Sequence, residues 1–252
     1  MRVYNNFGKL KIMKIPDLSN LKIKIFADGA DLASITSMSK NPLIKGFTTN
    51  PTLMRKAGIN DYEKFARNVL EIVTDLPVSF EIFADEENEI ERQAKKISSW
   101  GKNVNVKIPI TNTKGESLIP LIEKLSSFGI QLNITAILTL KQVKDTCEVL
   151  QHDTFNIVSV FAGRIADTGV DPFPIMQKCN SLMSKLKKTE LLWASPRQAY
   201  NIIEADNAGC GIITVTPELM AKTINFNKNL EILSLETVKM FFNDAKAAGY
   251  KL

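Results

Sequence analysis

Short apolar segments alternate with longer segments of helical periodicity along the chain, and this alternation is the feature that most restricts its fold. The strand-like segments span about residues 22–28, 44–48, 77–83, 103–109, 130–136, 156–161, 190–195 and 211–215. No linker rich in Pro, Gly or Ser separates them. Eight strand–helix units in a chain of 252 residues predict an α/β protein, a single-domain (β/α)8 TIM barrel. An open, doubly wound parallel sheet is the alternative that the same alternation allows.

The segments between the strands carry the signals of amphipathic helices. In "DYEKFARNVLEIVTD", Phe65, Val69, Ile72 and Val73 fall on one helical face. The segment "DEENEIERQAKKISSW" has acidic residues in its first turn and lysines near its end, which suits the helix dipole. Both segments therefore favour helices that cover the strands.

The fourth strand, "NVNVKIPIT", carries a lysine among apolar residues. Successive side chains of a strand point to opposite faces, so Val104, Val106 and Ile108 are predicted to pack under the helices. Asn105 and Lys107 then point into the barrel. A lysine is rarely buried without a partner, so Lys107 either pairs with an inward carboxylate for structure or serves chemistry.

The same alternation on the other strands sends more polar side chains inward. They lie toward the carboxyl ends of their strands, where barrel enzymes place their active sites. Aromatic Phe161 shares this inward face. The predicted inward set consists of Asp28, Ser79, Glu81, Asn133, Thr135, Ser159 and Phe161.

Several classes of site are excluded by what the sequence lacks. The one histidine, His152, leaves little for a Ser-His-Asp hydrolase or a histidine-based zinc site. Cys147, Cys179 and Cys210 stand far apart, without the spacing of metal ligands. The sequence also lacks a Gly-rich nucleotide loop. We therefore expect no metal and no cofactor.

Charge and hydropathy restrict the partners and the location. The net charge is +5, but lysines are dispersed without a long basic run or interleaved aromatic residues, so nucleic acid is not expected as a partner. Apolar runs are shorter than the roughly twenty residues of a membrane span, and no membrane association is expected. The sequence predicts a cytoplasmic protein, is compatible with a homo-oligomer, and favours phosphorylated small molecules as ligands of a local basic site.

The beginning of the chain differs from the rest. Residues 1–20 form a basic, nondescript segment, and Met13 is a candidate alternative start. We predict an N-terminal extension over residues 1–20 and a barrel domain with C-terminal helices over residues 21–252.

Among the inward residues, Lys107 is the strongest nucleophile. A lysine amine attacks a carbonyl only in its neutral form, and burial favours that form. The protonated imine that results withdraws electrons and allows the carbon–carbon bond between its α and β carbons to break. Proton transfers would then fall to the two inward carboxylates, Asp28 and Glu81, while Thr135 is placed to hold a water. This chemistry is that of a class I aldolase.

Five motifs in sequence order resemble the transaldolase family of class I aldolases. They are "GFTTNPTLM" after the second strand, "VNVKIPIT" on the fourth, "LNITAI" on the fifth, "SVFAGRIADTG" after the sixth and "WASPRQAYNII" on the seventh. The resemblance runs from about residue 23 to residue 220.

The resemblance implies a role for each matching residue. Lys107 would form the Schiff base, Asp28 would act as the acid and base, and Glu81 with Thr135 would activate a water. The remaining implied roles concern the substrate: Asn50 and Asn133 position the sugar, Ser159 and Ser195 contact it beside Phe161, and Arg164 and Arg197 bind the phosphate. Asn50 also precedes Pro51, a good first residue of a helix, so its side chain is placed to cap that helix.

Two positions separate the activities known in this family. Free fructose-6-phosphate aldolases tend to have Gln where this chain has Glu81 and Tyr where it has Phe161, whereas transaldolases have Glu and Phe. The resemblance therefore implies a transaldolase that moves a dihydroxyacetone unit from sedoheptulose 7-phosphate to glyceraldehyde 3-phosphate in the pentose phosphate pathway. An aldolase that releases dihydroxyacetone and a non-catalytic sugar-phosphate-binding barrel remain the alternatives.

Overall fold

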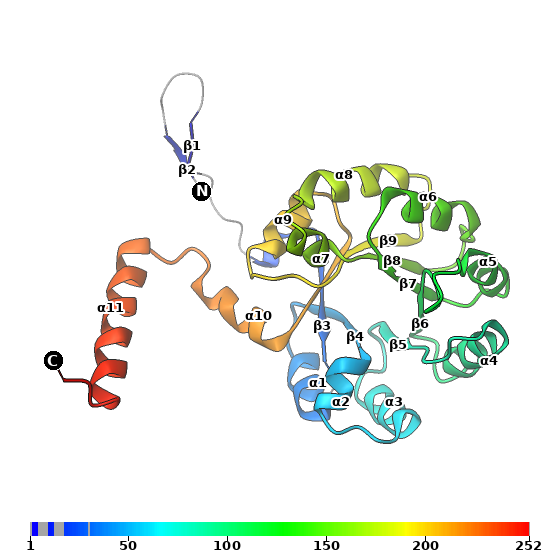
Figure 1. The fold of residues 1–252 in the computed structure, drawn as a ribbon, viewed down its shortest axis with the longest axis horizontal. Helices are drawn as coiled ribbons and strands as arrows, with labels where there is room; N and C mark the ends of the chain where they lie inside the picture. The colour runs from blue at the N-terminus through cyan, green and yellow to red at the C-terminus, as the bar shows by residue number, and fades with distance from the viewer. Residues whose placement is uncertain (1, 5–9, 13–17, 30, 252) are drawn as a thin grey trace. The chain divides into compact units, whose positions relative to one another are not determined.

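The computed structural model describes residues 2–4, 10–12, 18–29 and 31–251, and its central feature is a closed barrel of parallel strands. The barrel has the order β10-β3-β4-β5-β6-β7-β8-β9, in which each strand neighbours the next in sequence and the last closes on the first (Figure 1). The strands are β3 (Lys24–Asp28), β4 (Ile44–Thr48), β5 (Val78–Glu81), β6 (Val104–Pro109), β7 (Leu132–Ile137), β8 (Asn156–Val160), β9 (Thr189–Trp193) and β10 (Ile212–Val215). The predicted (β/α)8 barrel is confirmed, and each strand lies within about two residues of its predicted bounds.

Helices follow the strands and surround the barrel (Figure 1). They are α1 (Leu32–Ser39), α2 (Pro51–Lys56), α3 (Tyr62–Ile72), α4 (Glu87–Ser98), α5 (Ile119–Ser127), α6 (Leu140–Val149), α7 (Ala162–Asp167), α8 (Phe173–Leu182), α9 (Asn201–Asn207) and α10 (Pro217–Lys222). Side chains cap several of them: Asp31, Asn50, Asp61 and Thr139 each accept a hydrogen bond from a backbone N–H of the first turn. Each such cap stabilises a helix by about 1 kcal/mol.

The alternation predicted for the strands is what the barrel shows. Val104, Val106 and Ile108 of β6 are almost completely buried beneath the helices. Phe65 and Val69 of α3 are buried as well. Burial of one such side chain contributes about 1.5–3 kcal/mol, so these positions hold the helical layer on the barrel.

Strand register brings the inward polar residues side by side. Glu81 of β5 lies opposite Lys107 of β6, and Lys107 lies opposite Asn133 of β7. An apolar cluster of Phe26, Ile157, Leu192, Ala194 and Ile212 packs beside them. The inward polar residues at the carboxyl ends of the strands therefore adjoin an apolar part of the core.

The described residues divide into two compact units. Residues 21–221 contain the barrel, whereas the other unit combines residues 1–20 with residues 222–252. The second unit contains a two-stranded antiparallel sheet of β1 (Arg2–Tyr4) and β2 (Leu10–Ile12), the 3-10 helices η1 (Leu18–Asn20) and η2 (Thr223–Asn225), and the helix α11 (Leu230–Ala247). The predicted boundary between an extension at 1–20 and a domain at 21–252 stays a prediction, and Met13 lies outside the described residues.

Within the described part of the chain, no helix combines the length and the apolar character that a membrane crossing requires.

Candidate active site

A cavity of about 310 Å³ opens at the carboxyl ends of the barrel strands. Its walls include most of the residues predicted from the sequence, and all but Thr52 of α2 and Arg164 of α7 come from the strands or from the two residues after them. The lining consists of Asp28, Thr48, Asn50, Thr52, Glu81, Lys107, Thr135, Ser159, Phe161, Arg164, Leu192, Ala194, Ser195 and Thr214. Of the predicted site residues, Asn133 and Arg197 are absent from this lining.

Lys107 is held at the bottom of the cavity by two acceptors. Its side chain is almost buried, at 10% exposure, and its Nζ donates to Glu81 Oε2 and to the backbone carbonyl of Thr49, each at 3.0 Å. The predicted structural pairing with an inward carboxylate is therefore present. The same pairing also holds the amine in one place, facing the open cavity.

Burial disfavours the ionised forms of both carboxyl groups beside Lys107. For Glu81, burial raises the pKa above its ordinary value of 4.5, and the charge of Lys107 opposes this rise without cancelling it. For Asp28, burial likewise raises the pKa, again opposed by Lys107. Each carboxylate is therefore a stronger base than it would be in water.

Asp28 is held by hydroxyl and amide donors. Thr48 Oγ1 donates to its Oδ1 at 3.0 Å, and Asn50 Nδ2 donates to its Oδ2 at 3.1 Å. The Oδ1 of Asn50 accepts from the N–H of Leu53 at 2.9 Å, so the residue caps α2 as the sequence predicted. Asn50 thereby ties the start of α2 to the carboxylate.

Asn133 lies beneath the cavity in a buried network. Its Nδ2 donates to Ser79 Oγ at 2.9 Å, and Ser159 Oγ donates to its Oδ1 at 2.6 Å. Ser159 itself lines the cavity. Asn133 therefore fixes the orientation of Ser159 and of strand β5.

The Thr135 hydroxyl is a buried polar group without a hydrogen-bond partner among the described residues. The next residue, Ala136, has a φ of 61°, and the register of β7 against β8 shifts between Ile134 and Ile137. This local irregularity ends the regular pairing where Thr135 reaches the cavity.

The two predicted phosphate ligands differ in their surroundings. The Arg164 guanidinium lies 5.3 Å from the centroid of the Phe161 ring and lines the cavity. Arg197 instead forms an ion pair with Asp167, and its Nε donates to Asp167 Oδ1 at 3.0 Å. The pairing raises the pKa of Arg197 and lowers that of Asp167. Of these two arginines, Arg164 is the one that lines the cavity and forms no ion pair with a described residue.

Sequence reasoning missed five lining residues: Thr48, Thr52, Leu192, Ala194 and Thr214. The strand alternation used for Asp28 also applies to β4, β9 and β10, and would have placed four of these inside the barrel. Thr52 lies in the first turn of α2, where no periodic signal marks it.

Within residues 18–29 and 31–251 and the two short strands before them, no three His, Cys, Asp or Glu side chains gather into a group that could hold a metal ion.

The fold and the site together define a (β/α)8 barrel with a buried, carboxylate-paired lysine at the carboxyl ends of its strands. Residues 25–252 match the model of the transaldolase/fructose-6-phosphate aldolase family, and the chain belongs to this enzyme family.

Relatives with curated descriptions agree with this assignment. The chain is 35% identical over 197 residues to a probable transaldolase of Dehalococcoides mccartyi, covering 77% of this chain and 86% of the relative. It is 31% identical over 229 residues to a probable transaldolase of Thermoplasma volcanium, covering 89% of this chain and 99% of the relative.

Similar solved structures support the fold alone, because their sequences are distant. A monomeric dihydrodipicolinate synthase variant has a TM-score of 0.57 at 14% identity, covering 90% of this chain and 80% of that chain. A putative phosphonomutase from Burkholderia cenocepacia has a TM-score of 0.54 at 10% identity, covering 90% and 96%.

Proposed function

We propose that the protein is a transaldolase that carries a dihydroxyacetone unit from sedoheptulose 7-phosphate to glyceraldehyde 3-phosphate on Lys107. The observation that carries this proposal is the position of Lys107, whose Nζ lies 3.0 Å from Glu81 Oε2 at the bottom of a cavity that also contains Asp28. The products would be erythrose 4-phosphate and fructose 6-phosphate. The proposed setting is the pentose phosphate pathway of the cytoplasm.

In the first step, the Lys107 amine adds to the ketone carbon of the donor. The amine must lose a proton before it attacks, and Glu81 is the acceptor within hydrogen-bond distance. The raised pKa of Glu81 makes that transfer easier than transfer to an ordinary carboxylate. Loss of water from the adduct then gives the protonated imine.

Asp28 supports the second step, which breaks a carbon–carbon bond. The bond that breaks joins the α carbon of the imine to the β carbon, which bears a hydroxyl. Its electrons form the double bond of an enamine, and the hydroxyl on the β carbon loses its proton as that carbon departs as an aldehyde. Asp28 is proposed to take this proton, because burial raises its pKa and both of its oxygens are already oriented by Thr48 and Asn50. In the reverse sense, Asp28 returns the proton when the enamine attacks the acceptor aldehyde.

Water takes part in two steps. It is released when the first adduct becomes the imine, and it is consumed when the final imine is hydrolysed. Thr135 lines the cavity, and its buried Oγ1 has no hydrogen-bond partner among the described residues, so we propose that it binds this water together with Glu81. Arg164 at the rim is proposed to bind the substrate phosphate, and a guanidinium offers paired donors to phosphate oxygens.

Phe161 favours transfer over release of free dihydroxyacetone. Release requires a proton to reach the enamine carbon, and the Phe161 ring on the cavity wall has no hydroxyl to supply it. An aldolase that releases dihydroxyacetone is the second candidate, and Phe161 is the residue that decides between them.

The test measures dihydroxyacetone formation from fructose 6-phosphate with and without an aldehyde acceptor. We expect little release by the wild type without acceptor, and faster release by Phe161→Tyr, which adds one oxygen to a ring that already fits. Phe128→Tyr, on an exposed ring outside the cavity, is the matched control and should leave release unchanged. Wild-type release as fast as transfer would favour the aldolase.

A further inference from the structure

A second, larger cavity lies at the opposite end of the barrel from Lys107. Its volume is about 620 Å³, and its lining comes from the amino ends of the strands. Lys24 is the first residue of β3, Lys45 the second of β4, and Phe155 directly precedes β8. Because all eight strands are parallel, these positions share the end that the proposed reaction does not use.

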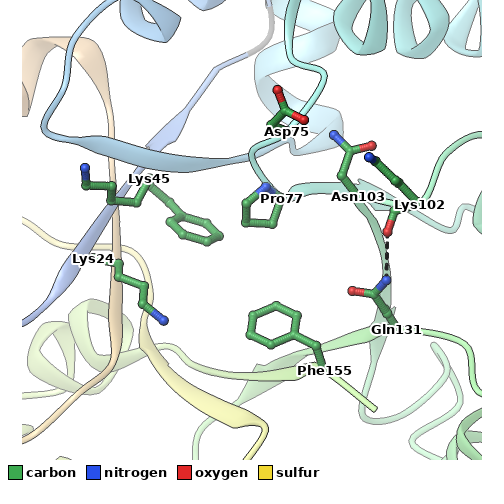
Figure 2. A pocket seen from close by; sticks show the side chains of 9 residues that line it. Lys24, Lys45, Asp75, Pro77, Lys102, Asn103, Gln131 and Phe155 are labelled. Atoms are coloured by element: carbon green, nitrogen blue, oxygen red, sulfur yellow. Dashed lines mark hydrogen bonds between the residues drawn. The ribbon is translucent and has the colours of Figure 1, made fainter.

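Lysines dominate the charge of this cavity. Lys24, Lys45 and Lys102 line it against a single carboxylate, Asp75 (Figure 2). Lys24 Nζ already pairs with Glu190 at 2.6 Å. Lys45 and Lys102 make no ion pair with any described residue. The ammonium groups of Lys45 and Lys102 are therefore available to attract an anionic ligand.

The floor of the cavity is apolar and aromatic. Phe155 and Pro77 flank the space between the lysines, as Figure 2 shows, and Phe26 contributes a third apolar wall. A side chain at Gly46 would come within 2.5 Å of the Phe26 ring, so glycine there lets the ring lie across β4. The cavity thus offers flat apolar surface next to positive charge.

The amide groups of the cavity are already engaged. Asn103 Nδ2 donates to the carbonyls of Val73 and Leu76, each at 2.9 Å, and Gln131 Nε2 donates to the Lys102 carbonyl at 2.9 Å (Figure 2). A sugar needs many partners for its hydroxyl groups, and this cavity leaves few free. An anion with an apolar body fits the lining better than a second sugar phosphate does.

We propose that this cavity is a binding site for a small amphiphilic anion, an aromatic ring or short apolar body that carries a carboxylate or a phosphate. The apolar body lies against Phe26, Phe155 and Pro77, and the anionic group is attracted by the positive charges of Lys45 and Lys102 on the two sides of the cavity. The volume falls in the usual range of roughly 300–1,000 Å³ for small-molecule sites. This proposal is independent of the reaction proposed for Lys107.

The direct test is titration of the full chain with 8-anilinonaphthalene-1-sulfonate, an aromatic sulfonate whose fluorescence rises on binding. The double charge reversal Lys45→Glu/Lys102→Glu should weaken binding at least about tenfold, since both cations become anions. Lys64→Glu, on an exposed lysine of α3 outside this cavity, is the matched control and should change binding less than about twofold. Equal effects of the two charge changes would overturn the proposal.

Two further variants separate this site from other places where the probe could bind. Gln131→Trp should fill the cavity and lower the binding of the probe, while Arg164→Ala at the other end should leave it unchanged. Circular dichroism and the thermal midpoint of each variant establish that it is folded before it is compared. Loss of binding in Arg164→Ala, or full binding in folded Gln131→Trp, would mean that the probe binds elsewhere. Either result would contradict a binding site at the amino ends of the strands.

Competition identifies the chemistry of the ligand. Benzoate and phenyl phosphate should each displace the probe, and the tighter of the two tells whether the site prefers a carboxylate or a phosphate. Inorganic phosphate and benzyl alcohol, which each lack one half of the proposed ligand, should displace it at least about tenfold less well. Displacement by benzyl alcohol as effective as by benzoate would contradict the role of the lysines.

Discussion

At the scale of single residues, the side chains of Lys107, Asp28 and Glu81 lie together in a largely buried site. Burial raises the pKa of both Asp28 and Glu81, and Lys107 only partly offsets the rise. A carboxyl group whose pKa is raised by folding contributes stability at low pH and loses it as the pH rises through the raised pKa. The arrangement proposed for proton transfer therefore costs stability at neutral pH.

Asp28→Asn tests this cost. The stability of the variant relative to the wild type should increase as the pH rises above the ordinary Asp value of 3.8, because the wild type must ionise a buried group and the variant need not. Urea unfolding at about pH 4.5 and about pH 8 measures the trend.

Asp85→Asn provides a control of opposite sign. Hydrogen bonds from Thr113 lower the pKa of Asp85, so its ionised form stabilises the fold above the ordinary value and that contribution is lost as the pH falls. The relative stability of Asp85→Asn should therefore decrease as the pH rises. Parallel trends in the two variants would mean that burial of Asp28 is not what shifts its pKa.

The two arginines allow a prediction about the phosphate. Arg164→Ala should weaken a phosphorylated ketose by about 1.5–3 kcal/mol, the contribution of a charge-assisted hydrogen bond, and should leave unphosphorylated fructose nearly unaffected. Arg197→Ala should have a smaller effect, because Arg197 pairs with Asp167 and does not line the cavity, and Asp167→Asn is the control for loss of that ion pair. Michaelis constants for both substrates are the measurement, and equal losses for both substrates would make the arginines structural.

At the scale of elements, the start of α7 packs directly on the end of β9. A Cβ atom at Gly163 would lie 1.6 Å from the carbonyl oxygen of Ser195, which itself has a φ of 60°. Glycine at this position lets α7 approach closely enough for Arg164 to reach the cavity.

Gly163→Ala should therefore destabilise the fold by about 1–3 kcal/mol or more, the usual cost of overpacking. Inside a helix the same substitution would ordinarily stabilise by about 0.5–1 kcal/mol, so the sign of the effect is the test. Ala166→Gly, in the same helix, should destabilise only by the ordinary helix amount. Thermal unfolding of both variants gives the answer, and an unchanged or raised midpoint for Gly163→Ala would contradict the close approach.

Strand alternation explains why much of the barrel and the site could be predicted from the sequence. A period of two residues assigns Lys107 and Glu81 to the inside without any knowledge of their neighbours, and parallel strands bring their ends together. Asn50 was predictable as a cap because Pro51 follows it. These features depend on local sequence.

Features that depend on distant residues were not predictable. Arg197 pairs with Asp167, 30 residues away, and nothing in either local sequence indicates that contact. The cavity at the amino ends of the strands also escaped prediction, although Lys24 shares the parity of Asp28 on β3, which strand alternation assigns to the inside. The other lysines of this cavity, Lys45 and Lys102, do not have the inward parity of a strand. The direction of their side chains depends on tertiary packing, which the local sequence does not indicate.

At the scale of the whole molecule, the helix α11 carries many exposed apolar side chains. They are Leu230, Ile232, Leu235, Val238, Met240, Phe241 and Phe242, each at least 50% exposed. Large exposed apolar patches are uncommon on monomeric proteins and mark interaction surfaces. The sequence was compatible with a homo-oligomer, and this helix is the described element that favours one.

We predict that the wild type self-associates and that Phe241→Ser/Phe242→Ser raises its dissociation constant at least about tenfold. Lys239→Ser, in the same helix, should have little effect. Light scattering over a range of concentrations measures the mass of each protein. A wild type that is monomeric throughout that range would contradict the prediction.

The proposed reaction depends on an imine between Lys107 and a ketose phosphate, and borohydride trapping detects that imine. Borohydride added to the protein with fructose 6-phosphate should reduce the imine and leave a stable adduct on Lys107, identified by peptide mass spectrometry. The adduct carries six carbons if the imine is reduced before the bond between its α and β carbons breaks, and three carbons if it is reduced afterwards. Lys107→Ala should give no adduct and no turnover, whereas Lys24→Ala, at the other end of the barrel, should give the same adduct as the wild type. An unmodified Lys107, or an adduct on another lysine, would show that Lys107 is not the residue that forms the imine.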